Sequence, residues 1–218
     1  MSEPRRGPEQ PDVEILERRV THQGFFRMEK FRLRHRLFCG AMSEPISREL
    51  FERGHAAALL LYDPWRDTVV LLEQFRIGAL DIPGGPWLVE IVAGVIDKDE
   101  TPEQVARREA VEEAGCAVQE MEFICEYLVS PGGTSERISL YCGCVDSRGV
   151  GGIHGLAEEA EDIRVSVVPF SLVWQWLEQG TINSASPIIA LQWLCMHRES
   201  LRQRWASGKC YGASPSNP

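Results

Sequence analysis

The sequence predicts an α/β (α+β) fold, with one mixed sheet and helices, preceded by a β-rich N-terminal arm. Three observations support this class. Polar and apolar residues alternate along Val13–Phe38, short apolar runs separated by turn residues follow from Ala56 onward, and start and stop signals enclose a helix over 102–114. The chain has 218 residues, 44% hydrophobic and 25% charged. This composition excludes a collagen, a coiled coil and a mostly disordered chain.

The arm has the two-residue period of a strand. Phe31, Leu33 and Leu37 face one way and the arginines between them face the other, while Gly24 marks a turn. We expect four regions along the chain: a flexible tip over 1–12, the arm over 13–50, one globular domain over 51–206 and a flexible tail over 207–218.

The domain shows six strand-like segments and three helices. The expected strands are Ala56–Tyr62, Thr68–Phe75, Leu88–Val92, Met121–Tyr127, Arg137–Val145 and Ile163–Phe170. The first helix begins at Thr101, whose side chain can cap it with Gln104 three residues later, and it ends before Gly115. Two further helices, Ser171–Gln179 and about Pro187–Ala206, complete the predicted fold.

The net charge of −9 argues against binding along a nucleic-acid backbone, which requires clustered Lys and Arg. A small phosphorylated substrate remains compatible with it if metal ions or local arginines reverse the field at the site. No apolar run approaches the length of a membrane span, and the first residues lack a secretion signal. We therefore expect a cytoplasmic protein that contacts neither membrane nor nucleic acid.

Carboxylates are concentrated on the first helix of the domain. Glu109 and Glu113 are four residues apart and so share a face, with Glu112 beside them. Three carboxylates this close repel one another, which is tolerated where a cation binds. Hard oxygen ligands suit Mg²⁺ or Mn²⁺. The alternative is a solvated acidic helix face. The larger pattern G-x5-E-x7-R-E-x-x-E-E-x-G, which starts at Gly94, favours the metal site over that alternative.

This pattern resembles the signature of the Nudix hydrolases. Its invariant positions are occupied by Gly94, Glu100, Arg108, Glu109, Glu112, Glu113 and Gly115. Ala110 and Cys116 stand where a larger aliphatic residue is usual. The resemblance implies an α/β/α sandwich and metal-dependent hydrolysis of a nucleoside diphosphate linked to another group.

Two loops further resemble the bacterial ADP-ribose pyrophosphatase (ADP-sugar diphosphatase) subfamily: the segment 130–136 and the acidic segment 152–164. This implies Mg²⁺-dependent hydrolysis of ADP-ribose to AMP and ribose 5-phosphate, by a homodimer that exchanges its N-terminal arms. Mn²⁺ is an expected substitute. The alternatives are a broader nucleoside diphosphate sugar hydrolase, acting on ADP-glucose or UDP-glucose, and a non-catalytic ADP-ribose-binding regulator.

The resemblance also assigns roles. The metal ligands are the Ala93 carbonyl and the side chains of Glu109, Glu113 and Glu161, with Glu112 as a further ligand or a support. Glu159 is the general base, with Glu158 as a near competitor.

For the substrate, the resemblance places Arg76 at a phosphate, and it places Arg48, Glu49 and Arg53 at the adenosine end. The terminal ribose would be held by Glu136 and the backbone of Ser130, Pro131 and Gly132. Phe25 and Phe26 match aromatics that stack on adenine, and the alternative for them is core packing.

Overall fold

A computed structural model describes residues 12–156 and 160–207 and divides them into two compact units. The arm unit contains the residues up to Gly54 together with Leu128–Glu136, and the body unit contains His55–Tyr127 and the chain from Arg137 onward. Residues 1–11 of the expected tip (1–12), residues 208–218 of the expected tail (207–218) and the base candidates Glu158 and Glu159 lie outside the described residues.

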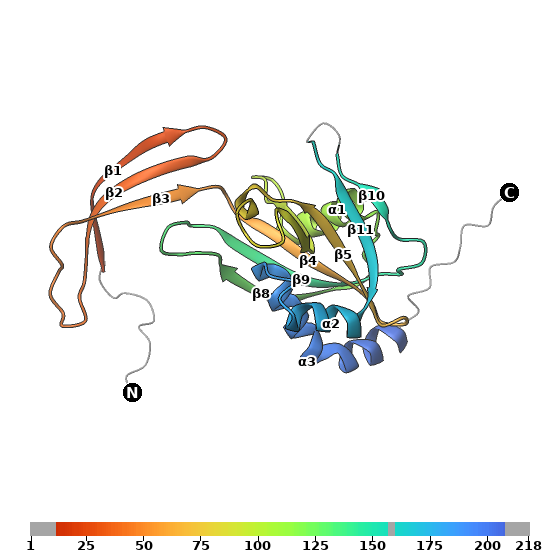
Figure 1. The fold of residues 1–218 in the computed structure, drawn as a ribbon. Helices are drawn as coiled ribbons and strands as arrows, with labels where there is room; N and C mark the ends of the chain where they lie inside the picture. Colours follow the sequence, from red (N-terminus) through yellow and green to blue (C-terminus); the bar gives the residue numbers. More distant parts are fainter. Residues whose placement is uncertain (1–11, 157–159, 208–218) are drawn as a thin grey trace. The chain divides into compact units, whose positions relative to one another are not determined.

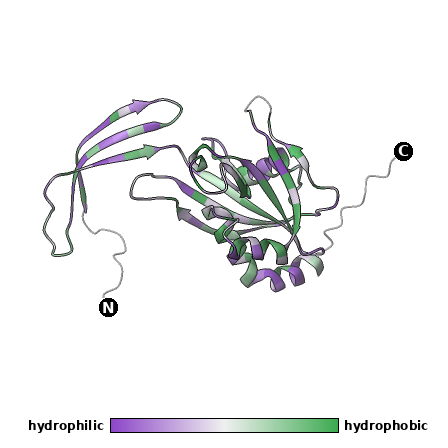
Figure 2. Cartoon of the chain, in the orientation of Figure 1, coloured by the Kyte–Doolittle hydropathy of each residue, from purple (hydrophilic) through white to green (hydrophobic). Residues whose placement is uncertain are grey.

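The arm unit is built on a three-stranded antiparallel sheet, with β1 (Val13–Gln23), β2 (Arg27–His35) and β3 (Ile46–Glu52) in that order (Figure 1). The predicted turn at Gly24 is confirmed, since its N–H donates to the carbonyl oxygen of Phe26 across 2.9 Å. Figure 2 shows hydrophilic and hydrophobic residues alternating along these strands. The strand β3 was not predicted, because its short stretch is mostly polar and becomes a strand through pairing with β2.

The body unit contains an eight-stranded mixed sheet. Six of its strands follow the order β10-β11-β5-β4-β9-β8, and the other two, β6 and β7, pair with β5 and β4. Its strands are β4 (Ala56–Asp63), β5 (Thr68–Phe75), β6 (Trp87–Glu90), β7 (Val92–Val95), β8 (Met121–Leu128), β9 (Arg137–Cys144), β10 (Gly152–His154) and β11 (Ile163–Pro169). The central strands β4 and β9 are parallel, while β5, β7 and β11 pair antiparallel with their neighbours.

Three helices cover the two faces of this sheet: α1 (Pro102–Ala114), α2 (Phe170–Glu178) and α3 (Ala185–Ser207). Residues of β4 alternate between two cores. Leu59 and Leu61 belong to the core that contains α1, whereas Leu60 and Tyr62 belong to the core under α2 and α3. All four are fully buried. The predicted α/β/α sandwich is therefore confirmed, with helices on both faces of a mixed sheet (Figure 1).

Three short elements differ from the predictions. One strand was expected over Leu88–Val92, but the chain breaks at Ile91 into β6 and β7, which pair with different neighbours. The strand β10 and the 3₁₀ turn Ile77–Ala79 were not predicted, because three residues are too few to show a period. In the part of the chain that the structure describes, no helix has both the length and the apolarity to cross a membrane.

Candidate active site

The helix α1 has the termini that its sequence requires. The Gln104 N–H donates to the Thr101 hydroxyl at 3.3 Å, and the Thr101 N–H donates to the Gln104 side chain at 2.8 Å. At the other end Gly115 adopts a left-handed conformation, with φ of 63°, and its N–H donates to the Val111 carbonyl. Both ends are thus satisfied without Glu109, Glu112 and Glu113, whose carboxylates remain available for other partners.

Arg108 organises three of these carboxylates. Its guanidinium donates to Glu109 and Glu112 at 2.8 Å each, and to both oxygens of Glu100 at 3.1 and 3.2 Å. The hydrogen bonds to Glu100, helped by the charge of Glu109, raise the pKa of Arg108. Arg108 therefore stays charged and holds Glu112 toward itself, which suits the supporting role that the sequence left open for Glu112.

Glu113 is the most enclosed acid of the helix. It is only 3% exposed, and its Oε2 accepts a hydrogen bond from the Ala93 N–H at 2.9 Å. Burial raises its pKa to about 8, and the charges of Glu109 and Glu161 contribute in the same direction. A carboxylate in this position gains from any nearby cation, because a cation offsets both the burial and the repulsion.

Glu109 lies against the loop that precedes the helix. A Cβ on Gly94 would stand 2.0 Å from Glu109 Oε1, so only glycine allows this approach. Burial raises the pKa of Glu109, Arg108 opposes the rise, and Glu112 and Glu161 add to it. The invariant glycine at the start of the pattern thus makes room for a carboxylate.

Glu161 comes from the segment before β11 and not from the helix. Its Oε2 accepts a hydrogen bond from the Leu156 N–H at 3.2 Å, and its N–H donates to the Leu156 carbonyl at 3.2 Å. Its charge contributes to the raised pKa of both Glu109 and Glu113. The charge of Glu161 therefore acts on the helix carboxylates, although the two segments are about fifty positions apart. Its role as a metal ligand stays a prediction.

The chemistry of this donor set fits a hard divalent cation. Glu109, Glu113 and Glu161 supply carboxylate oxygens, and Ala93, whose N–H donates to Glu113, carries the backbone carbonyl expected as a further ligand. The pKa of both helix acids is raised by burial and by repulsion, which a cation would relieve. Among the residues that the structure describes, no three His, Cys, Asp or Glu side chains already stand close enough to enclose an ion. The fit therefore rests on the chemistry of the donor oxygens and on the raised pKa of Glu109 and Glu113.

Arg76 is the predicted phosphate contact of the body unit. Its Nε donates to Glu90 Oε2 at 2.7 Å, and its positive charge opposes the rise in the pKa of Glu113. Arg76 therefore lies within electrostatic reach of the acidic group. Glu90 was not predicted as part of the site. The available signal was its place at the end of a strand just before the acidic pattern.

The predicted adenine and ribose residues lie in the arm unit. Phe26 packs edge-to-face on Phe25 and Phe51, with ring centroids 4.8 and 5.2 Å apart, and the Arg53 guanidinium stands 5.3 Å from its ring centre. Arg53 also pairs with Glu136 at 3.5 Å, and Glu136 is only 6% exposed. Phe25, in contrast, is 96% exposed. The structure thus gathers Phe26, Arg53 and Glu136 into one group, which we call the arm cluster.

The segment of Ser130, Pro131 and Gly132 belongs to a turn of the arm unit. The Ser130 carbonyl accepts hydrogen bonds from the N–H groups of Gly133 and Thr134 at 3.0 Å, and the Gly133 carbonyl accepts one from Phe51. The Glu136 N–H donates to the Thr134 hydroxyl. Local hydrogen bonds therefore fix this turn beside β3, which carries the residues just before Arg53.

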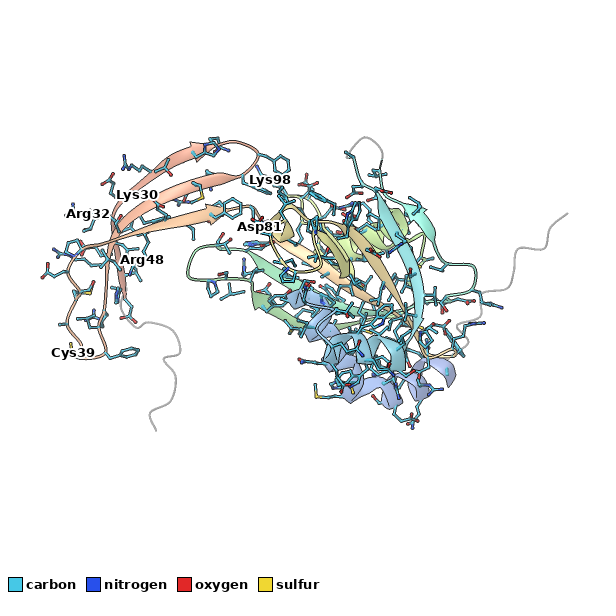
Figure 3. The ribbon with its side chains drawn as sticks, in the orientation of Figure 1. Lys30, Arg32, Cys39, Arg48, Asp81 and Lys98 are labelled. Atoms are coloured by element: carbon cyan, nitrogen blue, oxygen red, sulfur yellow. The ribbon has the colours of Figure 1, made fainter. Side chains whose placement is uncertain are left out.

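Arg48 and Glu49 were both placed at the adenosine end, but as neighbours on β3 their side chains point to different faces of the sheet. Arg48 lies opposite Phe31 on β2, and Glu49 lies opposite Lys30, so the two side chains occupy opposite faces of the arm sheet. Figure 3 labels Arg48 on β3 and Lys30 on β2. Both Arg48 and Glu49 are exposed. One sheet face can therefore present only one of them to a ligand.

Comparison with known proteins gives a consistent match. The model of the NUDIX domain matches residues 52–189. The ADP-ribose pyrophosphatase of Escherichia coli (strain K12) is 54% identical over 195 residues, covering 89% of this chain and 93% of the relative. The ADP-ribose pyrophosphatase of Haemophilus influenzae is 45% identical over 199 residues, covering 90% and 92%.

More distant matches have other names. The GDP-mannose pyrophosphatase of Cronobacter sakazakii is 40% identical over 149 residues, covering 67% of this chain and 76% of the relative. Among solved structures, the crystal structure of an ADP compounds hydrolase matches with a TM-score of 0.66 and 19% identity, over 91% of this chain and 98% of that one. At this identity the structural match supports the fold alone.

Proposed function

Because the chain belongs to the NUDIX domain family, we propose that it hydrolyses the diphosphate bond of ADP-ribose to give AMP and ribose 5-phosphate. The observation that carries the proposal is that the charge of Glu161, from outside the helix, acts on both Glu109 and Glu113 in the body unit. Two ADP-ribose pyrophosphatases at 54% and 45% identity, matched along almost their whole length, support the choice of substrate.

The reaction requires charge neutralisation, since the diphosphate oxygens are anionic and repel a nucleophile. We infer that Glu109, Glu113, Glu161 and the Ala93 carbonyl hold Mg²⁺, for which Mn²⁺ can substitute. When bound, such an ion neutralises phosphate charge and lowers the pKa of a coordinated water. Glu112 acts as a support through Arg108, which also fixes one side of Glu109.

Arg76 contributes a second source of positive charge. A guanidinium forms paired hydrogen bonds with phosphate oxygens as readily as with a carboxylate. In the free protein Glu90 holds Arg76 at 2.7 Å. On substrate binding, a diphosphate oxygen takes a place beside Glu90 on the same guanidinium, so Arg76 orients the diphosphate without a large rearrangement.

Proton removal from the attacking water is assigned by the resemblance to Glu159, with Glu158 as the alternative. The water oxygen forms a bond to one phosphorus, its proton passes to the carboxylate, and the bond from that phosphorus to the bridging oxygen breaks. The second phosphate leaves with the bridging oxygen. Glu161, two positions from Glu159, is held by Leu156 and serves as a ligand.

The arm cluster supports binding of the nucleoside part. Phe26 offers a ring that carries Arg53 above it, which is an arrangement that attracts a planar base. Glu136 and the turn of Ser130, Pro131 and Gly132 offer acceptors for ribose hydroxyls. Arg48 and Glu49 stay in the proposal as alternatives for the adenosine end, one on each face of the arm sheet.

We also propose a homodimer that exchanges its arms, in the cytoplasm. Ile15 and Val20 are more than half exposed and lie opposite Leu33 and Glu29, which share one face of the arm sheet. Exposed apolar residues on a sheet face favour a protein partner. Replacing both Ile15 and Val20 with Asp in the full chain should halve the mass measured by light scattering and raise KM for ADP-ribose. A variant of unchanged mass and KM would contradict the exchange, and Leu172→Asp on α2 is the matched control.

A broader nucleoside diphosphate sugar hydrolase is the second candidate, favoured by the GDP-mannose pyrophosphatase relatives. The test is release of the nucleoside monophosphate from ADP-ribose, ADP-glucose, UDP-glucose and GDP-mannose, each with Mg²⁺ and with EDTA. We expect the highest kcat/KM for ADP-ribose and no product with EDTA. Equal rates on all four would favour the broader activity, and tight ADP-ribose binding without any product would favour a regulator.

A further inference from the structure

The end of α1 is covered by an imidazole. A Cβ on Gly115 would lie 2.9 Å from Cε1 of His154 and 3.5 Å from its Nδ1. The ring of His154 therefore lies directly against the α-carbon of Gly115, the residue that ends the helix. This contact joins the helix that carries Glu109 and Glu113 to the strand β10.

The orientation of the imidazole is set by one hydrogen bond. The Nε2 atom lies 3.1 Å from the Gly151 carbonyl oxygen, and since a carbonyl only accepts, Nε2 carries the proton. His154 also borders a cavity of about 290 Å³, lined among others by Cys116, Arg148 and Val150. The contacts with Gly115 and Gly151 therefore hold the ring at the edge of this cavity.

The residues after His154 continue directly to Glu161. A Cβ on Gly155 would stand 2.7 Å from the Glu161 Cβ, and Leu156 exchanges two hydrogen bonds with Glu161. On the opposite strand, the Cα partner of His154 is Ile163, which is fully buried in the core that contains α1. His154 thus lies where β10 and β11, the two strands that flank the Glu161 segment, meet α1.

We propose that His154 is a positioning residue, which seats the β10–β11 pair on the end of α1 and so sets the place of Glu161 relative to Glu109 and Glu113. This inference rests on the proposed function, because it assigns those three carboxylates to one cation. His154 itself contacts neither the cation nor the substrate. Its effect acts through Gly155 and Glu161.

The test compares Mn²⁺ binding by the full chain without substrate, followed by electron paramagnetic resonance or calorimetry. In His154→Ala we expect the Kd for Mn²⁺ and the Mg²⁺ concentration for half-maximal activity to rise about tenfold. KM for ADP-ribose at saturating Mg²⁺ should stay within about twofold. His154→Gln, whose amide can donate to Gly151, should recover most of the affinity.

Two further variants keep the test decisive. His154→Leu fills a similar space but cannot donate to Gly151, and we expect it to fold because it leaves no cavity. It should still weaken Mn²⁺ binding if His154→Ala does not fold. The matched control is His197→Ala on α3, since that imidazole also lies within hydrogen-bonding distance of a backbone carbonyl, that of Trp193, at 2.8 Å. We expect this control to leave Mn²⁺ binding unchanged.

The proposal is overturned if folded His154→Ala or His154→Leu binds Mn²⁺ and responds to Mg²⁺ within twofold of the natural chain. A different result would contradict the proposed function instead: a natural chain that binds Mn²⁺ but releases no AMP from ADP-ribose. In that case the comparison of Mn²⁺ affinities still decides the role of His154.

Discussion

Replacing Glu113 with Gln should change how the stability of the protein depends on pH. Glu113 is buried, and its pKa of about 8 compares with an ordinary value of 4.5. Between these values the folded protein holds a proton that the unfolded chain has lost. The free energy of unfolding therefore falls as pH rises, and the stabilisation present below pH 4.5 is lost by pH 8.

The magnitude follows from the two pKa values. Each pH unit across this window changes the free energy of unfolding by about 1.4 kcal/mol, and the window spans about 3.5 units, so the total is roughly 5 kcal/mol. Glutamine has the same size and no ionisable group, so the variant lacks this slope. Above pH 8, without metal, Glu113→Gln should be more stable than the natural chain by several kcal/mol relative to their difference at pH 5.

The assay is urea unfolding in EDTA at pH 5, 7 and 9, followed by tryptophan fluorescence, because all six tryptophans belong to the body unit. Glu103→Gln is the control, since Glu103 is an exposed acid on the same helix. The reasoning is refuted if the stability difference between Glu113→Gln and the natural chain varies by less than about 1 kcal/mol from pH 5 to pH 9.

Three further predictions concern activity and metal binding. Glu159→Gln should lower kcat and kcat/KM together while Mn²⁺ binding stays intact. Glu161→Gln should instead need more Mg²⁺ for half-maximal activity and be partly rescued at high Mg²⁺. A Mg²⁺ titration of both variants checks this, and the opposite pattern would reverse the two roles. Phe26→Ala should raise KM for ADP-ribose about tenfold with little change in kcat, measured by initial rates, and an unchanged KM would remove Phe26 from the binding site. Gly94→Ala places a methyl group on the Glu109 carboxylate and displaces it, so calorimetry should show at least about tenfold weaker Mn²⁺ binding. Normal affinity would contradict the claim that the close approach to Gly94 places Glu109 for the metal.

Much of the body unit could be predicted because its signals are local. The capping residues around α1 and the apolar run of β4 depend on neighbours in the sequence, and both were located within a residue or two. The strand β3 depends instead on β2, and the division into β6 and β7 depends on which strand each one pairs with. Such pairings leave no period in a short stretch of sequence.

The features of the site likewise divide into those with a local sequence signal and those that depend on the fold. The spacing of Glu109 and Glu113 placed them on one helix face from the sequence alone. The pair of Arg76 with Glu90 and the contact of His154 with Gly115 join segments that are distant in sequence, so only the fold could reveal them. Arg48 and Glu49 are adjacent in sequence, yet their side chains lie on opposite faces of the arm sheet, because neighbours in a strand face opposite ways.

The most direct test of the central claim, that the acids of α1 and Glu161 hold the cation that hydrolysis requires, is a Mg²⁺ titration of ADP-ribose hydrolysis. It compares the natural chain with Glu113→Gln and with Glu103→Gln as the control. We predict that Glu113→Gln loses at least about a hundredfold in kcat, corresponding to roughly 2.7 kcal/mol of barrier, and needs far more Mg²⁺, while Glu103→Gln keeps the natural values. Full activity of Glu113→Gln at the natural Mg²⁺ optimum would contradict the account and leave α1 with a merely solvated acidic face.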